Sequence, residues 1–197
     1  MSKALSAPLT PAARPAAVVR LRAAGIVLGG SALVAVCAHV ALPLYFTPVP
    51  LTLQTFAVLL LGLLLSPRMA AATLGAYLVE GALGLPVFAP DPHLSAGVAH
   101  LLGPTGGYLI AYPLAAALIS FLWRHARHGF TAATLCAAAG SLAILACGAL
   151  WLEIFTHASA QSALALAVLP FLPGDALKIA AAAAVATGFQ RLHRPVR

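Results

Sequence analysis

The stretch PGDALK at residues 173–178 opens the last apolar run of this 197-residue chain, and the interpretation of the other segments depends on it. It places Asp175 three residues before Lys178, and the nearest other charged residues are Glu153 and Arg191. An ionised side chain beside hydrocarbon costs roughly 2.5 to 3.5 kcal/mol on insertion scales, so it is rarely found there without a partner or a task. The Pro-Gly pair ends the preceding segment, so Asp175 is expected at the N-cap or in the first turn of a helix. Residues three apart share one helix face, which predicts that Asp175 and Lys178 point the same way.

The composition excludes a water-soluble globular domain. Hydrophobic residues make up 62% of the chain and charged residues only 8%, whereas soluble domains carry about 25% charged residues. The chain is therefore predicted to be an all-α integral membrane protein. At about 20 residues per span, its length allows one compact bundle of six transmembrane helices. The net charge of +7 is not gathered on a soluble basic module, so no nucleic-acid partner is expected.

Apolar runs, turn residues and prolines divide the chain. Residues 1–20 are expected to form a disordered cytoplasmic N-terminal tail, 21–190 a six-helix transmembrane substrate-binding domain, and 191–197 a basic cytoplasmic C-terminal tail. A signal peptide is not expected, because the first apolar run leads directly into further membrane segments. Residues 162–172 are apolar but too short to cross alone, which predicts an interfacial or re-entrant piece. The six predicted spans are 23–42, 51–66, 69–85, 106–123, 131–152 and 175–190.

The basic residues indicate the orientation. Ten of the eleven Lys and Arg residues fall in the tails or in alternate connections, which the positive-inside rule assigns to the cytoplasm together with both termini. The protein is thus expected to be a multi-pass protein of the bacterial cytoplasmic membrane. Lys178 is the eleventh cation and lies on the outer side, where a bound anion, or Asp175 and Glu80 as neighbours, would neutralise it. The ten inner cations are Lys3, Arg14, Arg20, Arg22, Arg68, Arg124, Arg127, Arg191, Arg194 and Arg197.

Two other polar features lie near the outer side. In PVPLTLQT (residues 48–55) the prolines favour a stiff extended segment, and Thr52, Gln54 and Thr55 then offer hydrogen-bonding groups. Local chemistry favours a helix cap and a polar entry turn over a ligand contact at this stretch. Glu80 lies within a predicted span, where it is either a hydrogen-bonded packing residue or an acid that faces a cavity.

Several kinds of catalytic site are not indicated. The stretch GPTGGYL at 103–109 lacks the Lys-Ser or Lys-Thr of a phosphate-binding loop, so the protein is not expected to hydrolyse ATP itself, and its glycines instead favour close packing. The seven histidines show no metal-ligand spacing, and the sequence contains no GxSxG motif. We therefore expect no enzyme, no catalytic residue, no metal and no cofactor. The three cysteines, Cys37, Cys136 and Cys147, lie in apolar runs and are interpreted as small core residues.

Three stretches together, PVPLTLQT at 48–55, GLPVFA at 84–89 and GPTGGYL at 103–109, resemble the BioY family. This family comprises the biotin-binding membrane (S) components of energy-coupling factor (ECF) vitamin importers, and the Asp-x-x-Lys of 175–178 agrees with its pattern. The resemblance implies a six-helix bundle that binds biotin near its outer face, with the first outer connection (44–50) and the PVPLTLQT stretch (48–55) together as a lid region. It also implies a separate transmembrane coupling protein and two ABC-type ATPases as partners, although some members are reported to work without them. A homo-oligomer is the alternative assembly. The sequence departs from the family pattern at 90–93 and at Glu80.

The resemblance also implies a binding site. Asp175 and Lys178 are expected to line the biotin pocket, with Thr52 and Gln54 of the lid region nearest the ligand. A carboxylate accepts hydrogen bonds from the ureido N–H groups of biotin, and Lys178 meets either the valerate carboxylate or the ureido oxygen. The remaining expected contacts are Tyr77, Glu80, Phe88 and Tyr108.

Three other functions remain open from the sequence. A vitamin such as thiamine or riboflavin fits the same scaffold, but the anionic tail of biotin suits an outer lysine better. A small intramembrane enzyme would use Glu80 or Glu153 as a general acid or base. In a purely structural subunit, Asp175 and Lys178 would pair only with each other. Biotin capture and uptake is the function that we expect.

Overall fold

The computed structural model describes residues 16–91 and 96–192, and within them nearly all regular structure is helical. Two short strands, β1 (Ala41–Leu42) and β2 (Leu51–Thr52), pair antiparallel with Ala41 opposite Thr52. This extended element flanks the first outer connection and was not part of the all-α prediction. The helices are α1 (Ala16–His39), α2 (Gln54–Leu64), α3 (Pro67–Ala82), α4 (Val98–Leu102), α5 (Gly106–His125), α6 (Phe130–Thr156), α7 (Ala160–Ala167) and α8 (Leu172–Leu192).

Each of the six predicted spans corresponds to one helix, but the bounds differ. α1 begins at Ala16, so residues 16–20, which were predicted to be disordered, are helical; residues 1–15 and 193–197 lie outside the described ranges. The break between the predicted spans 51–66 and 69–85 belongs to the first turn of α3, because Ser66 caps the helix through Met69 N and Pro67 suits the first helical position. The predicted re-entrant piece at 162–172 is most of α7 and the turn that follows it.

Not all of these helices are long enough to cross a bilayer. Within the described residues, α1, α5 and α6 have the length and hydropathy of a span, and α7 with α8, bent by 52° at their junction, would make a fourth. α2 has 11 residues and α3 has 16, fewer than the roughly 20 that a straight span needs. The chain therefore has the helices of a multi-pass membrane protein, three or four of them long enough to span a bilayer alone, with shorter helices packed between them.

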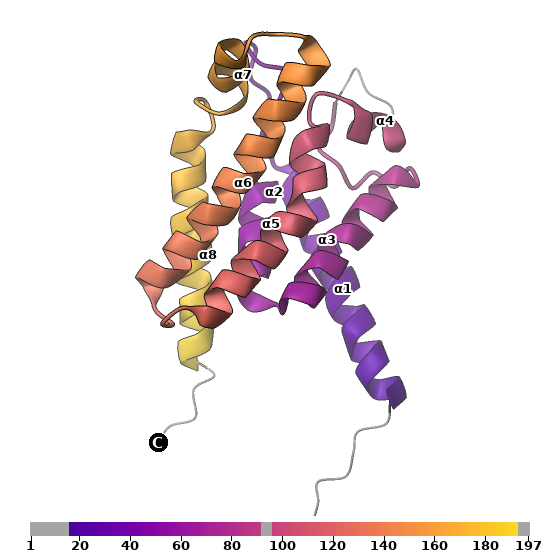
Figure 1. Ribbon diagram of the computed structural model, residues 1–197. Coiled ribbons are helices and arrows are strands. Elements are labelled where there is room, and N and C mark those ends of the chain that lie inside the picture. The colour runs from indigo at the N-terminus through magenta and orange to yellow at the C-terminus, as the bar shows by residue number, and fades with distance from the viewer. Residues whose placement is uncertain (1–15, 92–95, 193–197) are drawn as a thin grey trace, which may run out of the picture.

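The helices form one bundle around α5. α5 packs against α2, α3 and α6, whereas α8 packs against α2 and α6, and α1 against α2 and α3. α5 and α6 run side by side through the middle of the molecule (Figure 1). Their approach depends on Gly107, where a Cβ would lie 2.2 Å from Trp151 Cβ and 2.6 Å from the carbonyl oxygen of Cys147. The close packing predicted for the glycines of 103–109 is confirmed at Gly107.

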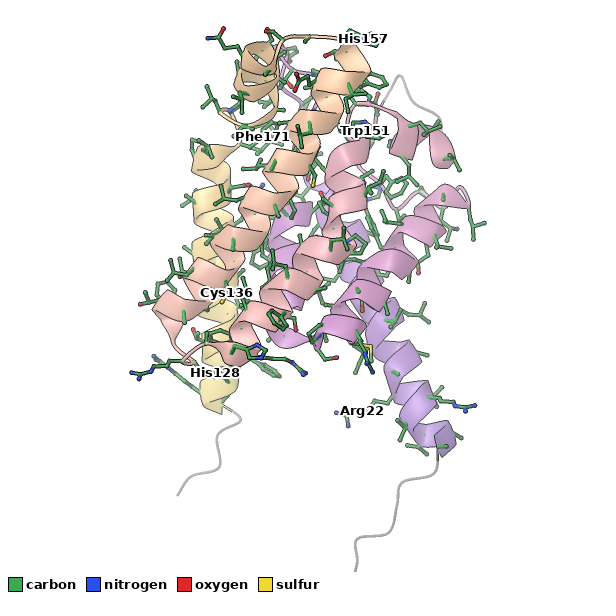
Figure 2. The ribbon with its side chains drawn as sticks, in the orientation of Figure 1. Arg22, His128, Cys136, Trp151, His157 and Phe171 are labelled. Atoms are coloured by element: carbon green, nitrogen blue, oxygen red, sulfur yellow. The ribbon has the colours of Figure 1, made fainter. Side chains whose placement is uncertain are left out.

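The two ends of the bundle differ in charge. The start of α1 and the end of α8 lie at the lower end in Figure 1, and α4 and α7 lie at the upper end. Arg22 and His128 lie near the lower end and His157 near the upper end (Figure 2). The other described arginines lie in the first turns of α1 and α3, around the α5–α6 turn and at the end of α8, which all belong to the lower end.

The cysteines were predicted as core residues, and this is correct for two of them. Cys37 and Cys136 are buried, but Cys147 is exposed on α6. The error has a physical cause. A helix face that contacts lipid is as apolar as one that contacts protein, so an apolar run does not reveal which of its residues are inside.

Candidate functional site

A cavity of about 40 Å³ lies between the first outer connection and the N-terminal ends of α2, α5 and α8. By surface area its wall is mainly apolar, with Val49, Leu109, Ile144, Leu145 and Phe171 among the lining residues. A mostly apolar pocket with a few placed polar groups is typical of a small-molecule site. The polar residues that line it are Thr52, Thr55, Thr105, Tyr108, Tyr112, Asp175 and Lys178.

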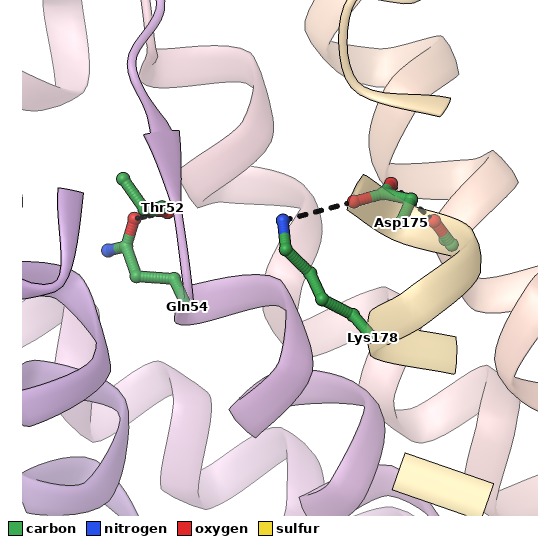
Figure 3. Close-up of polar contacts among 5 residues, drawn as sticks. Thr52, Gln54, Asp175 and Lys178 are labelled. Atoms are coloured by element: carbon green, nitrogen blue, oxygen red, sulfur yellow. Dashed lines mark hydrogen bonds and ion pairs between the residues drawn. The ribbon is translucent and has the colours of Figure 1, made fainter. Parts of the chain in front are cut away.

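The charged pair is held at this cavity by α8. Lys178 Nζ lies 3.2 Å from Asp175 Oδ1, and the two side chains are 10% and 6% exposed. Asp175 lies in the first turn of α8, as predicted, and both side chains point toward the lid region (Figure 3). Ser141 of α6 donates a hydrogen bond of 2.7 Å to Asp175 Oδ2. A carboxylate oxygen accepts more than one hydrogen bond and an ammonium donates three, so both groups retain capacity for a ligand.

A chain of hydrogen bonds fixes the polar side of β2. Thr52 donates to Gln54 Oε1 at 3.0 Å, and Gln54 Nε2 donates to the Tyr77 hydroxyl at 2.6 Å. The Tyr77 hydroxyl donates in turn to the carbonyl oxygen of Val87 at 3.0 Å. Only Thr52 of this chain lines the cavity, and Gln54 and Tyr77 are buried behind it. Gln54 therefore orients Thr52, the residue of this chain that reaches the cavity, and connects β2 to α3.

Two further predicted contacts lie elsewhere. Phe88 packs edge-on against Tyr77, with ring centroids 5.4 Å apart, and borders a different cavity near His39. Glu80 accepts a hydrogen bond from the Ser31 hydroxyl across the contact between α1 and α3. Four of the eight predicted contacts are thus brought together at the cavity: Thr52, Tyr108, Asp175 and Lys178.

Several residues at the site were not predicted as contacts. Ser141 is 34 residues from Asp175. No fixed spacing in the sequence predicts which residues of two different helices meet, so this contact could not be predicted. Tyr112, by contrast, is one helical turn after Tyr108 and lines the same cavity, so the period of α5 was a usable signal. Thr55 was recognised as a polar residue of the lid region but was not selected, and Phe171 gave no polar signal.

The first outer connection covers the cavity and is anchored to α7. Thr47 Oγ1 donates to the carbonyl oxygen of Leu166 at 2.9 Å, and Thr47 and Val49 are buried. The Tyr108 hydroxyl donates to the carbonyl oxygen of Ala167 at 2.6 Å. The last carbonyl groups of a helix have no partner within that helix, so side chains from two other elements satisfy them here. The lid region and α5 are therefore both fastened to the end of α7.

The described residues show no arrangement typical of metal binding. Within 16–91 and 96–192, no group of three or more His, Cys, Asp or Glu side chains is close enough to hold a metal ion. Asp175 is engaged by one serine and one lysine. The charged groups of the site are thus engaged in hydrogen bonding and charge pairing with neighbouring side chains.

Known proteins with a similar sequence indicate one family. Residues 10–195 match the BioY family. A probable biotin transporter of Pyrococcus horikoshii is 41% identical over 143 residues, which cover 73% of this chain and 82% of the relative. A biotin transporter of Thermotoga maritima is 34% identical over 163 residues, covering 83% and 92%. The crystal structure of the S-component for biotin from an ECF-type ABC transporter superposes with a TM-score of 0.80 at 24% identity, over 88% of this chain and 93% of that chain, which supports the fold. The chain belongs to the BioY family, as its motifs predicted.

Proposed function

We propose that this protein captures biotin on the outer side of the cytoplasmic membrane and takes it up as the S component of an ECF-type importer. The observation that carries the proposal is the Asp175–Lys178 pair, held by Ser141 at a largely apolar cavity. The names of relatives that are 41% and 34% identical support it. Membership of a family of transporter components also argues against an intramembrane enzyme built on Glu80 or Glu153.

The chemistry of biotin suits this cavity. Its cyclic urea offers two N–H donors and one acceptor oxygen, its sulfur ring is apolar, and its valerate chain ends in an anion. Asp175 accepts a hydrogen bond from a urea N–H, and the ammonium N–H groups of Lys178 that do not bind Asp175 attract the valerate anion. The apolar ring then packs against walls such as Phe171 and Leu109. No cofactor and no metal take part in this scheme.

Binding requires the lid region to move. The cavity of about 40 Å³ is far below the roughly 300 to 1,000 Å³ of sites that enclose a small molecule. The 44–50 connection contributes Val49 and Pro50 to this wall and is tied to the end of α7 through Thr47. We propose that this connection opens to admit biotin and then closes over it.

The transport cycle needs a direction and an energy source. We propose that the chain crosses the membrane six times, with the short helices α2 and α3 crossing together with the residues that flank them, and that both termini lie in the cytoplasm. The arginine-rich end of the bundle supports this orientation. The sequence contains no Walker A motif, so the energy is proposed to come from a coupling protein and two ABC-type ATPases. The alternative assembly is a homo-oligomer of this chain without that module.

Direct binding tests the proposed function. Calorimetry on the purified protein in detergent is expected to show heat on adding biotin, with one site per chain, because biotin complements the charge pair. Thiamine and riboflavin serve as controls and are expected to give no comparable heat. Binding of either of these instead of biotin would assign the same scaffold to another vitamin.

The lid anchor gives a kinetic prediction. In Thr47→Val the hydrogen bond to Leu166 and that from Val49 N are both lost. A neutral hydrogen bond contributes about 1 kcal/mol, so biotin is expected to dissociate roughly 5- to 10-fold faster, with little change in its association rate. The measurement is release of radiolabelled biotin into an excess of unlabelled biotin.

A matched control exists at the other end of the bundle. Thr131 is exposed at the start of α6, so Thr131→Val is expected to release biotin at the wild-type rate. Equal release from wild type and Thr47→Val would show that this anchor does not hold the lid.

A further inference from the structure

The hydroxyl group of Thr55 differs from the other polar groups of the cavity. Thr55 Oγ1 is buried without a hydrogen-bond partner, and within residues 16–91 and 96–192 no other side-chain nitrogen or oxygen shares this state. Thr55 also lines the cavity that holds Asp175 and Lys178. A buried polar group without a partner costs stability, so each instance in a native protein needs an explanation.

The position of Thr55 in α2 explains why its hydroxyl has no hydrogen-bond partner. Threonines further inside the helices donate to the carbonyl oxygen four residues back. Thr55 is the second residue of α2, and the residue four positions back, Leu51, belongs to β2. The four hydroxyls with such bonds are those of Thr73 to Met69, Thr134 to Phe130, Thr156 to Leu152 and Thr187 to Ala183, at 2.7 to 2.9 Å.

Several neighbouring polar groups in the cavity already make hydrogen bonds within the protein. Thr52 donates to Gln54, and the Tyr108 hydroxyl donates to the carbonyl oxygen of Ala167. Each oxygen of Asp175 accepts one hydrogen bond. Thr55 therefore supplies a neutral donor, fixed on a helix, that makes no bond within the protein. A ligand with an acceptor atom would satisfy it.

We propose that Thr55 is a specificity-determining contact that donates a hydrogen bond to the urea oxygen of the ligand. The assignment rests on the proposed function as a biotin-binding protein. A cyclic urea needs an acceptor for its N–H groups and a donor for its oxygen, and Asp175 and Thr55 supply these two. A neutral hydroxyl matches a neutral urea, whereas the charge of Lys178 matches the carboxylate of the valerate chain. With these contacts, the urea ring of biotin lies toward α2 and its valerate carboxylate lies toward Lys178.

The isosteric variant Thr55→Val tests this assignment through two readouts of opposite sign. Without ligand, the thermal unfolding midpoint in detergent is expected to stay level or rise by a few degrees, because an unsatisfied buried oxygen becomes a methyl group. Biotin affinity is expected to fall about tenfold, because one hydrogen bond to the ligand is lost. Thr55→Ser, which retains the hydroxyl, is expected to restore most of the affinity.

Thr187→Val is the matched control, since it removes a satisfied hydroxyl near the far end of α8 and is expected to bind biotin like the wild type. Unchanged affinity of Thr55→Val would overturn the assignment. A fall in both the midpoint and the affinity would indicate a structural role and would also overturn it. Failure of the wild type itself to bind biotin would refute the proposed function, and the assignment of Thr55 as a biotin contact would fall with it.

Ligand analogues identify the atom that Thr55 contacts. Replacing the urea oxygen of biotin by sulfur weakens the acceptor, so the penalty of Thr55→Val is expected to shrink for this analogue, as in a double-mutant cycle. For biotin methyl ester, which lacks the anion, the full tenfold penalty is expected to remain. The reverse pattern would place Thr55 at the carboxylate and overturn the assignment to the urea.

Discussion

Asp175→Asn is expected to weaken biotin binding by about 100-fold or more. Removing one member of a buried, hydrogen-bonded charge pair typically costs about 2 to 5 kcal/mol, and every 1.4 kcal/mol is a factor of ten in affinity. The variant leaves Lys178, whose side chain is 10% exposed, without its counter-ion. It also replaces an acceptor for the urea N–H groups by a neutral amide that accepts less strongly. The measurement is calorimetry or equilibrium binding of radiolabelled biotin.

The matched control is Glu80→Gln, the same change from acid to amide in another helix. Glu80 is engaged by Ser31 between α1 and α3 and does not line the cavity, and a glutamine oxygen still accepts from that hydroxyl. Its biotin affinity is expected to remain close to that of the wild type. If Asp175→Asn bound biotin as tightly as the wild type, the pair would be a purely structural contact of α8. If Glu80→Gln lost binding, the ligand would reach the α1–α3 contact.

Gly107→Ala is expected to disrupt the bundle itself. The added Cβ would lie 2.2 Å from Trp151 Cβ and 2.6 Å from the carbonyl oxygen of Cys147, so α5 and α6 would have to separate. Overpacking typically costs about 1 to 3 kcal/mol and more where backbone must shift. We expect a loss of about 3 kcal/mol or more, which corresponds to a thermal midpoint lower by roughly 10 °C. Thermal unfolding followed by size-exclusion chromatography in detergent measures it.

Gly188→Ala provides the comparison, because a Cβ at this position of α8 meets no atom within 4 Å. Alanine is favoured over glycine in a helix by up to about 1 kcal/mol, so this variant is expected to be as stable as the wild type or slightly more stable. A Gly107→Ala protein with an unchanged midpoint would show that α5 and α6 do not approach each other as closely as described.

The sequence was sufficient for properties that depend on short distances along the chain. Hydropathy and the spacing of cations predicted a multi-pass membrane protein with its arginines at one end. The three-residue spacing of Asp175 and Lys178 predicted that they point the same way, because one helix turn fixes this whatever surrounds the helix, and the structure shows them as an ion pair. The family motifs predicted membership of the BioY family, which the match over residues 10–195 confirms.

The tertiary structure decided which side chains reach the cavity. Glu80 faces α1, Gln54 lies behind Thr52, and Ser141 approaches Asp175 from a different helix. Hydropathy does not distinguish these positions, since in a membrane protein the lipid-facing and protein-facing sides of a helix are both apolar. The rotation of each helix is set by its packing against the others, so polar contacts between helices become visible only once the bundle is assembled.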